Sequence, residues 1–139
     1  MKETLAFHIS ALYHDFLAYT TEELKKFGLS FGQMPFIIYV GKHNGCTQAE
    51  LTRELKLDWG YSQRTVARLV SNDFMIKKYE AEKSCNCLSL TPNGIKAFNA
   101  CHNVFYSWDS LNAKELSAKE KENLISLLNK ITAGEKGSY

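Results

Sequence analysis

The sequence is poor in the residues that break or cross-link a chain. Its 139 residues include only two prolines, eight glycines and four cysteines. With 45% hydrophobic and 23% charged residues, this composition argues against a disordered or fibrous chain and predicts one globular domain. The four cysteines are irregularly spaced, which does not suit a secreted disulfide framework, so we expect reduced thiols.

Long apolar runs and an excess of charge of one sign are also missing. No run is long enough to cross a bilayer, and the first residues lead into an amphipathic pattern, so we expect a cytoplasmic protein without membrane contact. The net charge of +2 excludes a basic tail that coats nucleic acid. Arginine is the scarce basic residue, and Arg53, Arg64 and Arg68, which are all the arginines of the chain, lie within one short stretch.

Catalytic motifs are absent as well. The sequence has no glycine-rich phosphate loop, no His-Glu-x-x-His motif and no serine between elbow glycines. Its four histidines are dispersed, without the spacing of metal ligands. We therefore expect a protein that is not an enzyme and that has no metal or cofactor.

Helical periodicity covers both ends of the chain. It predicts a long helix over about 3–27, ended by the glycine that follows, and a second, more apolar helix after Ser30. Near the other end, Thr91 caps a fifth helix and a capping box at Ser117 opens a sixth. The polar tail from Gly134 is expected to fray.

The middle of the chain has a different pattern. A capping box at 47–50 opens a short third helix, and a fourth is predicted over about 61–72. Two strands at 75–79 and 87–90, joined by the polar loop 80–86, form the only predicted β-structure. Helix, turn, helix and hairpin is the element order of a winged helix-turn-helix, in which one helix enters the DNA major groove.

The predicted DNA contacts follow from this order. Arg64 and Arg68 lie one turn apart on the fourth helix, and a guanidinium suits guanine edges and phosphates, while Gln63 can pair with adenine. Hydroxyls near the helix start and lysines on the hairpin can reach phosphates. The predicted DNA-binding residues are Thr47, Gln48, Tyr61, Ser62, Gln63, Arg64, Thr65, Arg68, Lys77, Lys78 and Lys83. The alternative is that these are ordinary solvated side chains.

Several short pieces, in order, resemble the MarR family of bacterial transcription regulators, and the resemblance covers nearly the whole chain. The pieces are Gly28-Leu29-Ser30 followed by Gln33, Thr47-Gln48-Ala49-Glu50-Leu51, Met75-Ile76-Lys77-Lys78, Leu90-Thr91-Pro92-Asn93-Gly94, and Leu116-Ser117 with Glu120. The resemblance implies a single domain over 1–139, mainly α with a small β-hairpin wing. A winged helix-turn-helix lobe would span about 30–95, and helices over about 1–28 and 96–134 would form a homodimer.

The function that the resemblance implies is a repressor that binds a pseudo-palindromic operator in double-stranded DNA. Two departures stand out. The family usually has Asp-x-Arg at the wing tip, where this chain has Glu82-Lys83-Ser84, so Lys83 is the one cation there and wing contacts should be weaker. Phe74 stands where the family often has glycine before the first wing strand, and we expect Asn72 or Asp73 to take the left-handed turn.

Two signals could release the DNA. The resemblance implies a small lipophilic or aromatic ligand, with Tyr13, Phe36, Tyr39 and Trp59 as candidate lining residues; the alternative is that they are simple core aromatics. Cys85 and Cys87 are candidate redox sensors, because nearby lysines would favour the thiolate, or else ordinary strand residues. A third alternative is a winged-helix protein-interaction module that does not bind DNA.

Overall fold

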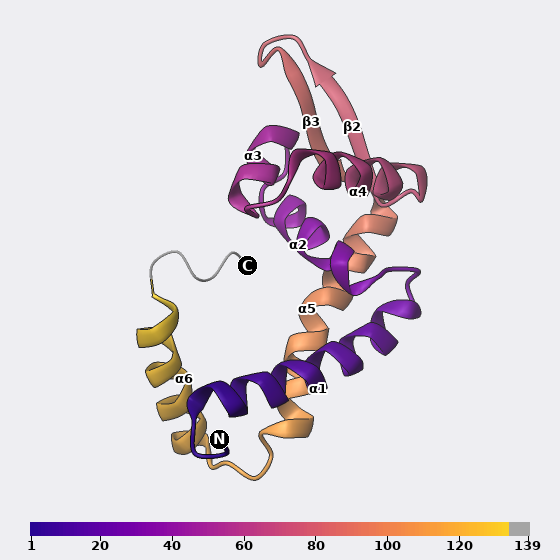
Figure 1. Ribbon diagram of the computed structural model, residues 1–139. Coiled ribbons are helices and arrows are strands. Elements are labelled where there is room, and N and C mark those ends of the chain that lie inside the picture. Colours follow the sequence, from indigo (N-terminus) through magenta and orange to yellow (C-terminus); the bar gives the residue numbers. More distant parts are fainter. Residues whose placement is uncertain (134–139) are drawn as a thin grey trace.

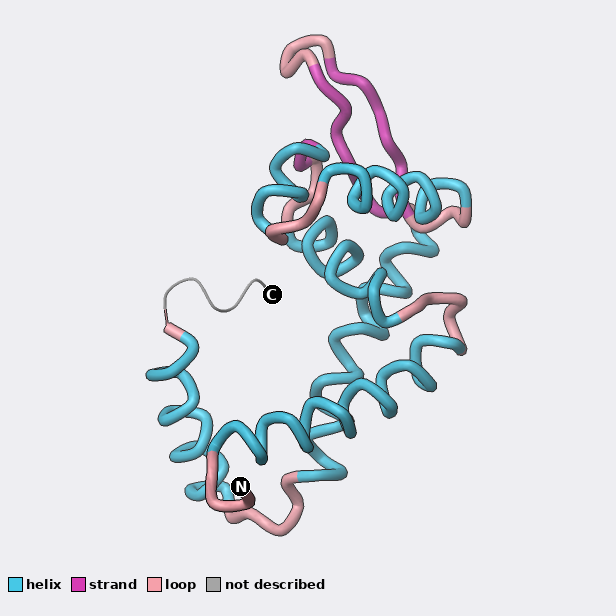
Figure 2. Tube along the Cα trace, in the orientation of Figure 1, coloured by secondary structure: helices cyan, strands magenta, loops and turns pink. Residues whose placement is uncertain are grey.

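The computed structural model describes residues 1–133, and the predicted tail from Gly134 lies outside the described residues. This part of the chain is mainly helical with a small antiparallel sheet, as predicted (Figures 1 and 2). Its elements are α1 (Leu5–Lys25), the 3₁₀ turn η1 (Phe31–Gln33), α2 (Met34–Lys42), β1 (Cys46–Thr47), α3 (Gln48–Glu54), α4 (Trp59–Ser71), β2 (Met75–Glu80), β3 (Cys85–Leu90), α5 (Pro92–Asn112) and α6 (Ala118–Thr132).

Polar caps set the starts of the helices. Both predicted capping boxes are present, at Thr47 for α3 and at Ser117 for α6. The helix α4 begins two residues earlier than predicted, because the Asp58 carboxylate accepts the backbone N–H of Tyr61 at 2.9 Å and so caps the helix at Trp59.

The sheet is larger than the sequence predicted. The prediction that the hairpin is the only β-structure is wrong, because the two-residue strand β1 pairs with β3 through Cys46–Leu88 and Thr47–Cys87. A strand of two residues is too short to leave a periodic pattern. The hairpin itself is also longer, since Glu80 pairs with Cys85 and the loop shrinks to residues 81–84.

The core lies inside the winged-helix lobe. Phe36 and Ile37 of α2, Leu51 of α3, Leu69 of α4 and Leu88 of β3 are all at most 1% exposed. These side chains pack both helices of the helix-turn-helix against the sheet and against α2. Full burial of a large apolar side chain stabilises the folded state by about 1.5–3 kcal/mol.

The chain enters the wing through a left-handed residue. Asp73 has φ of +65°, which confirms the expected turn before Phe74. The helix α1 ends at Lys25, two residues before the predicted end, and Gly28, with φ of +74°, is the left-handed residue of the turn that follows.

The other end of the molecule is built from α1, the second half of α5, and α6. Phe16 of α1 packs against Phe105 and Trp108 of α5, with ring centroids 5.2 and 5.7 Å apart, and the Trp108 indole N–H donates to Asp15 at 2.9 Å. The helix α6 stands away from the lobe (Figure 1) and has no buried residue.

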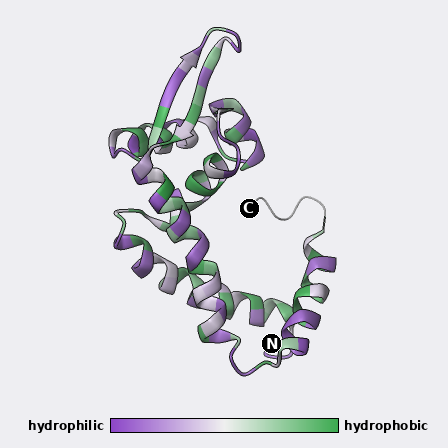
Figure 3. Cartoon of the chain, turned by 180° about the vertical axis from the view of Figure 1, so that it is seen from behind, coloured by the Kyte–Doolittle hydropathy of each residue, from purple (hydrophilic) through white to green (hydrophobic). Residues whose placement is uncertain are grey.

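Large apolar side chains remain exposed at this end. Hydrophobic stretches colour both α1 and α6 in Figure 3. The exposed residues are Leu5, Phe7, Ile9, Leu12 and Tyr13 of α1, Tyr106 and Leu111 of α5, and Leu124, Ile125, Leu127 and Ile131 of α6. Apolar surface gathered on neighbouring helices marks an interaction surface. No helix within residues 1–133 combines the length and the hydropathy that a membrane span needs.

Candidate nucleic-acid interface

The helix α4 presents a polar outer face. Val66 and Leu69 are fully buried, whereas Gln63, Arg64 and Arg68 are exposed. Among the described residues, neither arginine has an ion-pair or hydrogen-bond partner. Arg64 folds back over Gly60, where a Cβ would lie 3.1 Å from its Nη1. Two unpaired guanidinium groups on one helix face can bind phosphates or base edges.

A hollow of about 330 Å³ separates α4 from the wing. Trp59 and Gln63 line it from α4, and Lys77 and Tyr79 line it from β2. Its floor includes Gln48, which is 6% exposed and whose amide Nε2 has no hydrogen-bond partner. The outer face of α4 thus borders a cavity that carries one lysine and two aromatic side chains.

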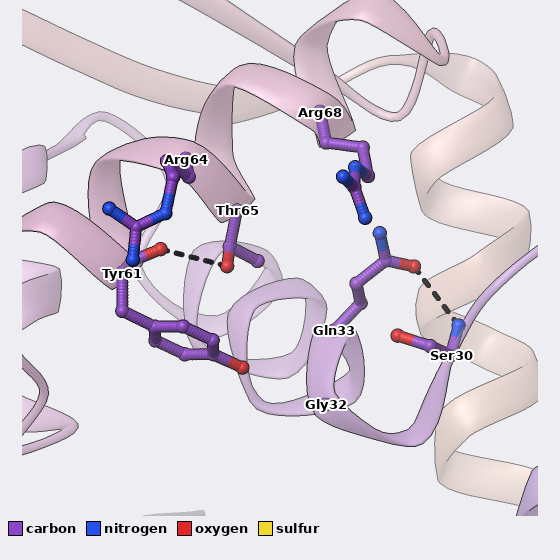
Figure 4. Close-up of a pocket in the computed structure, with 7 residues that line it drawn as sticks. All are labelled: Ser30, Gly32, Gln33, Tyr61, Arg64, Thr65 and Arg68. Atoms are coloured by element: carbon purple, nitrogen blue, oxygen red, sulfur yellow. Dashed lines mark hydrogen bonds between the residues drawn. The ribbon is translucent and has the colours of Figure 1, made fainter.

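A second hollow, of about 200 Å³, lies on the opposite flank of α4. Figure 4 shows the seven residues that line it, which are Ser30, Gly32 and Gln33 at η1 and Tyr61, Arg64, Thr65 and Arg68 on α4. None of these lining residues is acidic. Sequence reasoning noted Ser30 and Gln33 only as part of a family motif, because nothing in their spacing shows that η1 lies beside α4.

Ser62 does not belong to this surface, and its predicted role in DNA binding is wrong. It is 0% exposed, and its Oγ lies 2.6 Å from Thr52 Oγ1. The Thr52 hydroxyl donates to the Gln48 carbonyl at 2.7 Å, so the Ser62 hydroxyl is the donor of this pair. The side chain therefore joins α4 to α3 and cannot reach a phosphate.

Two further predicted DNA-binding residues, Gln48 and Thr65, are almost fully buried. Thr65 is 9% exposed, and its hydroxyl donates to the Tyr61 carbonyl at 2.9 Å. Gln48 lies at the floor of the wing-side hollow, whereas Thr47 is half-buried and serves as the N-cap of α3. All three side chains are therefore less exposed than those of Gln63 and the arginines.

The wing lysines differ in direction. Lys77 shares the hollow with Gln63, whereas Lys78 follows it in β2 and therefore points to the other face of the sheet. Lys83, at the wing tip, donates from Nζ to the Gly45 carbonyl at 3.3 Å. The wing thus directs one lysine toward α4.

The four candidate ligand-lining aromatics do not form a common site. Trp59 lines the wing-side hollow, and none of the cavities described for residues 1–133 is lined by the other three. Phe36 is 1% exposed in the core, Tyr13 contacts Phe31, and Tyr39 stacks on His43 with ring centroids 4.2 Å apart. Helical spacing could not show that these side chains point to different parts of the molecule.

The cysteines do not support a low-pKa redox pair. Cys87 is buried, and desolvation raises the pKa of its thiol by more than the nearby charge of Lys83 lowers it. Burial likewise raises the pKa of Cys46 to about 11 and that of Cys101 to about 12. Cys85 is the partly exposed cysteine.

We expect iodoacetamide to label the native protein at Cys85 alone, because alkylation needs an accessible thiolate. Mass spectrometry after digestion measures the modified sites, and labelling in urea provides the control in which all four cysteines react. Equal labelling rates for Cys85 and Cys87 in the native protein would contradict the burial argument.

Comparison with known proteins identifies relatives along nearly the whole chain. It is 36% identical over 132 residues to the HTH-type transcriptional regulator BilQ of Clostridium symbiosum strain WAL-14163, a match that covers 94% of this chain and 92% of BilQ. No family model matches the chain.

Solved structures show the same fold. The reduced form of MarR from E. coli is similar with a TM-score of 0.81 at 22% identity, covering 92% of this chain and 96% of that one. The S. aureus MepR–DNA complex has a TM-score of 0.74 at 19% identity, covering 95% and 96%. The relatives are regulators, not enzymes, and this chain belongs to the HTH-type transcriptional regulators and has the fold of MarR.

Proposed function

We propose that this regulator is a homodimeric repressor that binds a pseudo-palindromic operator in double-stranded DNA. The observation that carries the proposal is the outer face of α4, where Gln63, Arg64 and Arg68 are exposed and both arginines lack partners within the described residues. Residues near the start of a recognition helix reach base edges, so Gln63 and Arg64 are the proposed base-reading residues. Lys77 and Lys83 supply the wing contacts.

The dimer is supported by the apolar surface that one chain leaves exposed. Leu12 of α1 and Leu127 of α6 are 52% and 57% exposed, and they are two of a larger set on the same helices. A two-fold axis through these helices would bury both copies of this surface. It would also present two α4 helices to two half-sites of one DNA duplex.

Release by a small lipophilic ligand is part of the proposal. A groove of about 210 Å³ between α1 and α5 is lined by Tyr19, Phe27 and Val104, together with Glu23, Ala100, Asn103 and Ser107. Its volume is below the roughly 300 Å³ of drug-sized sites, so it suits a small aromatic or aliphatic compound. A ligand that shifts α1 against α5 would change the distance between the two α4 helices of a dimer.

The test is a mobility shift with the DNA that flanks the gene of this protein. We expect a shifted complex that survives competition by scrambled DNA and weakens steeply with salt, because phosphate contacts release counterions. Transcription from the same promoter in vitro should fall when the protein is added. Absence of a specific shift, or a flat salt response, would favour the protein-interaction module instead.

A further inference from the structure

We propose that the hollow between η1 and α4 holds a backbone phosphate of the bound DNA, with Arg68 and Gln33 as its principal donors. The inference rests on the proposed function and names the part of the DNA that this flank of α4 contacts. It adds Gln33, which lies outside the helix-turn-helix, to the DNA interface. It also assigns Arg68 to the phosphate backbone rather than to a base.

The first argument is a pair of donors that face each other. Gln33 is 8% exposed, and its Oε1 accepts the Ser30 backbone N–H at 3.0 Å, so the orientation of the amide is set and its Nε2 points at the Arg68 guanidinium (Figure 4). An amide NH₂ and a guanidinium can only donate, so they cannot bond to each other. Both groups would be satisfied by one acceptor between them, and a negative charge suits the arginine best.

The rest of the hollow fits the same ligand. The Tyr61 hydroxyl lies over Gly32, where a Cβ would be 3.2 Å from it, and the Ser30 hydroxyl lies at the opposite side of the hollow (Figure 4). No carboxylate lines the cavity, which excludes a cation site made by these residues. Hydroxyl, amide and guanidinium donors are the groups that proteins use to bind DNA phosphates.

The position of the hollow on α4 indicates which phosphates it meets. The major groove is about 12 Å wide and admits one α-helix, so the two flanks of that helix face the two phosphodiester strands. One flank of α4 carries the hollow with Lys77, and the other carries the hollow with Arg68. Arg68 lies in the last turn of α4, beyond the residues near the helix start that reach base edges.

The test measures how binding to a mixed-sequence DNA duplex of about 30 base pairs depends on salt. The protein can bind such a duplex through phosphate contacts alone. Arg68→Gln removes the charge at an exposed position, and Gln33→Glu keeps the acceptor for Ser30 while placing a carboxylate in the hollow. Fluorescence anisotropy gives the affinity at several salt concentrations. The matched control is Arg53→Gln, because Arg53 Nε lies 3.5 Å from Glu54 Oε1 and the side chain lines neither hollow.

We expect Arg68→Gln to reduce the slope of log affinity against log salt by about one per protomer and to weaken binding about five- to tenfold per half-site near 0.1 M salt. The loss should be the same on the promoter DNA and on the mixed-sequence duplex. Gln33→Glu should weaken binding at least as much, and Arg53→Gln should leave the slope unchanged. A thermal melt of each variant shows that the fold is retained, and if Gln33→Glu unfolds, the Arg68→Gln result decides.

Three results would overturn the inference. An unchanged salt slope for Arg68→Gln would show that the substitution removes no phosphate contact. A loss of affinity confined to promoter DNA would assign Arg68 to a base. Inorganic phosphate that binds the free protein in an Arg68-dependent way, together with an unchanged DNA slope, would make the hollow a site for small anions. A wild-type protein that binds neither duplex would refute the proposed function itself, which separates the two failures.

Discussion

Replacing Leu127 by aspartate is expected to convert the proposed dimer to a monomer and to weaken binding to the proposed operator by about a hundred- to ten-thousandfold, because the two half-sites are then no longer bound as a linked pair. Leu127 is 57% exposed on α6, a helix with no residue buried within its own chain. A carboxylate there would have to be buried, unpaired, in an apolar interface. Because Leu127 contributes nothing to the core, the monomer should still fold.

Light scattering after gel filtration measures the change, as a fall from twice the protomer mass to the protomer mass of 15.8 kDa. Asn129→Asp is the control, since it adds the same charge on the exposed polar side of the same helix. We expect this control to keep both the mass and the affinity of the wild type. A Leu127→Asp protein that elutes as a dimer with normal affinity would show that α6 is not in the interface.

The second large effect is expected at Gly94, where alanine should lower the free energy of unfolding by about 3 kcal/mol through overpacking. A Cβ at Gly94 would overlap the Phe74 carbonyl oxygen and would lie 3.1 Å from Leu90 Cβ. That carbonyl accepts the Thr91 N–H at 3.1 Å, and the Thr91 hydroxyl donates to the Asp73 carbonyl at 2.5 Å. Backbone on both sides of the wing is therefore held against the start of α5.

Urea denaturation followed by circular dichroism measures this loss. Alanine in a helix interior normally stabilises by about 1 kcal/mol over glycine, so a loss here cannot come from helix propensity. The exposed substitution Asn99→Ala on the same helix is the control and should change stability by about 0.5 kcal/mol or less. Equal stability of the two variants would contradict the prediction, because it would show that the backbone at Phe74 moves to make room for the added methyl group.

Local signals predicted most of the fold. Capping boxes at Thr47 and Ser117 mark helix starts because their hydrogen bonds join residues three apart, and these bonds are visible in the sequence. The left-handed turn, expected at Asn72 or Asp73 and found at Asp73, followed instead from the family resemblance and from the tolerance of these residue types for positive φ. The two-residue strand β1 was missed, because its pairing with β3 joins residues some forty positions apart.

The candidate site shows the same division. Periodicity placed Arg64 and Arg68 on the exposed side of α4, since one helix face follows from spacing alone. The same spacing could not show that Ser62 lies against Thr52 of α3, because that depends on how the two helices pack.

The sequence by itself determined the helices, the hairpin, the family resemblance and the polar face of α4, because each depends on residues that are near neighbours along the chain. The tertiary structure alone decided that Gln33 faces Arg68, that Cys87 is buried, and that α6 leaves its leucines uncovered. These features depend on contacts between distant segments, whose geometry local propensity does not encode.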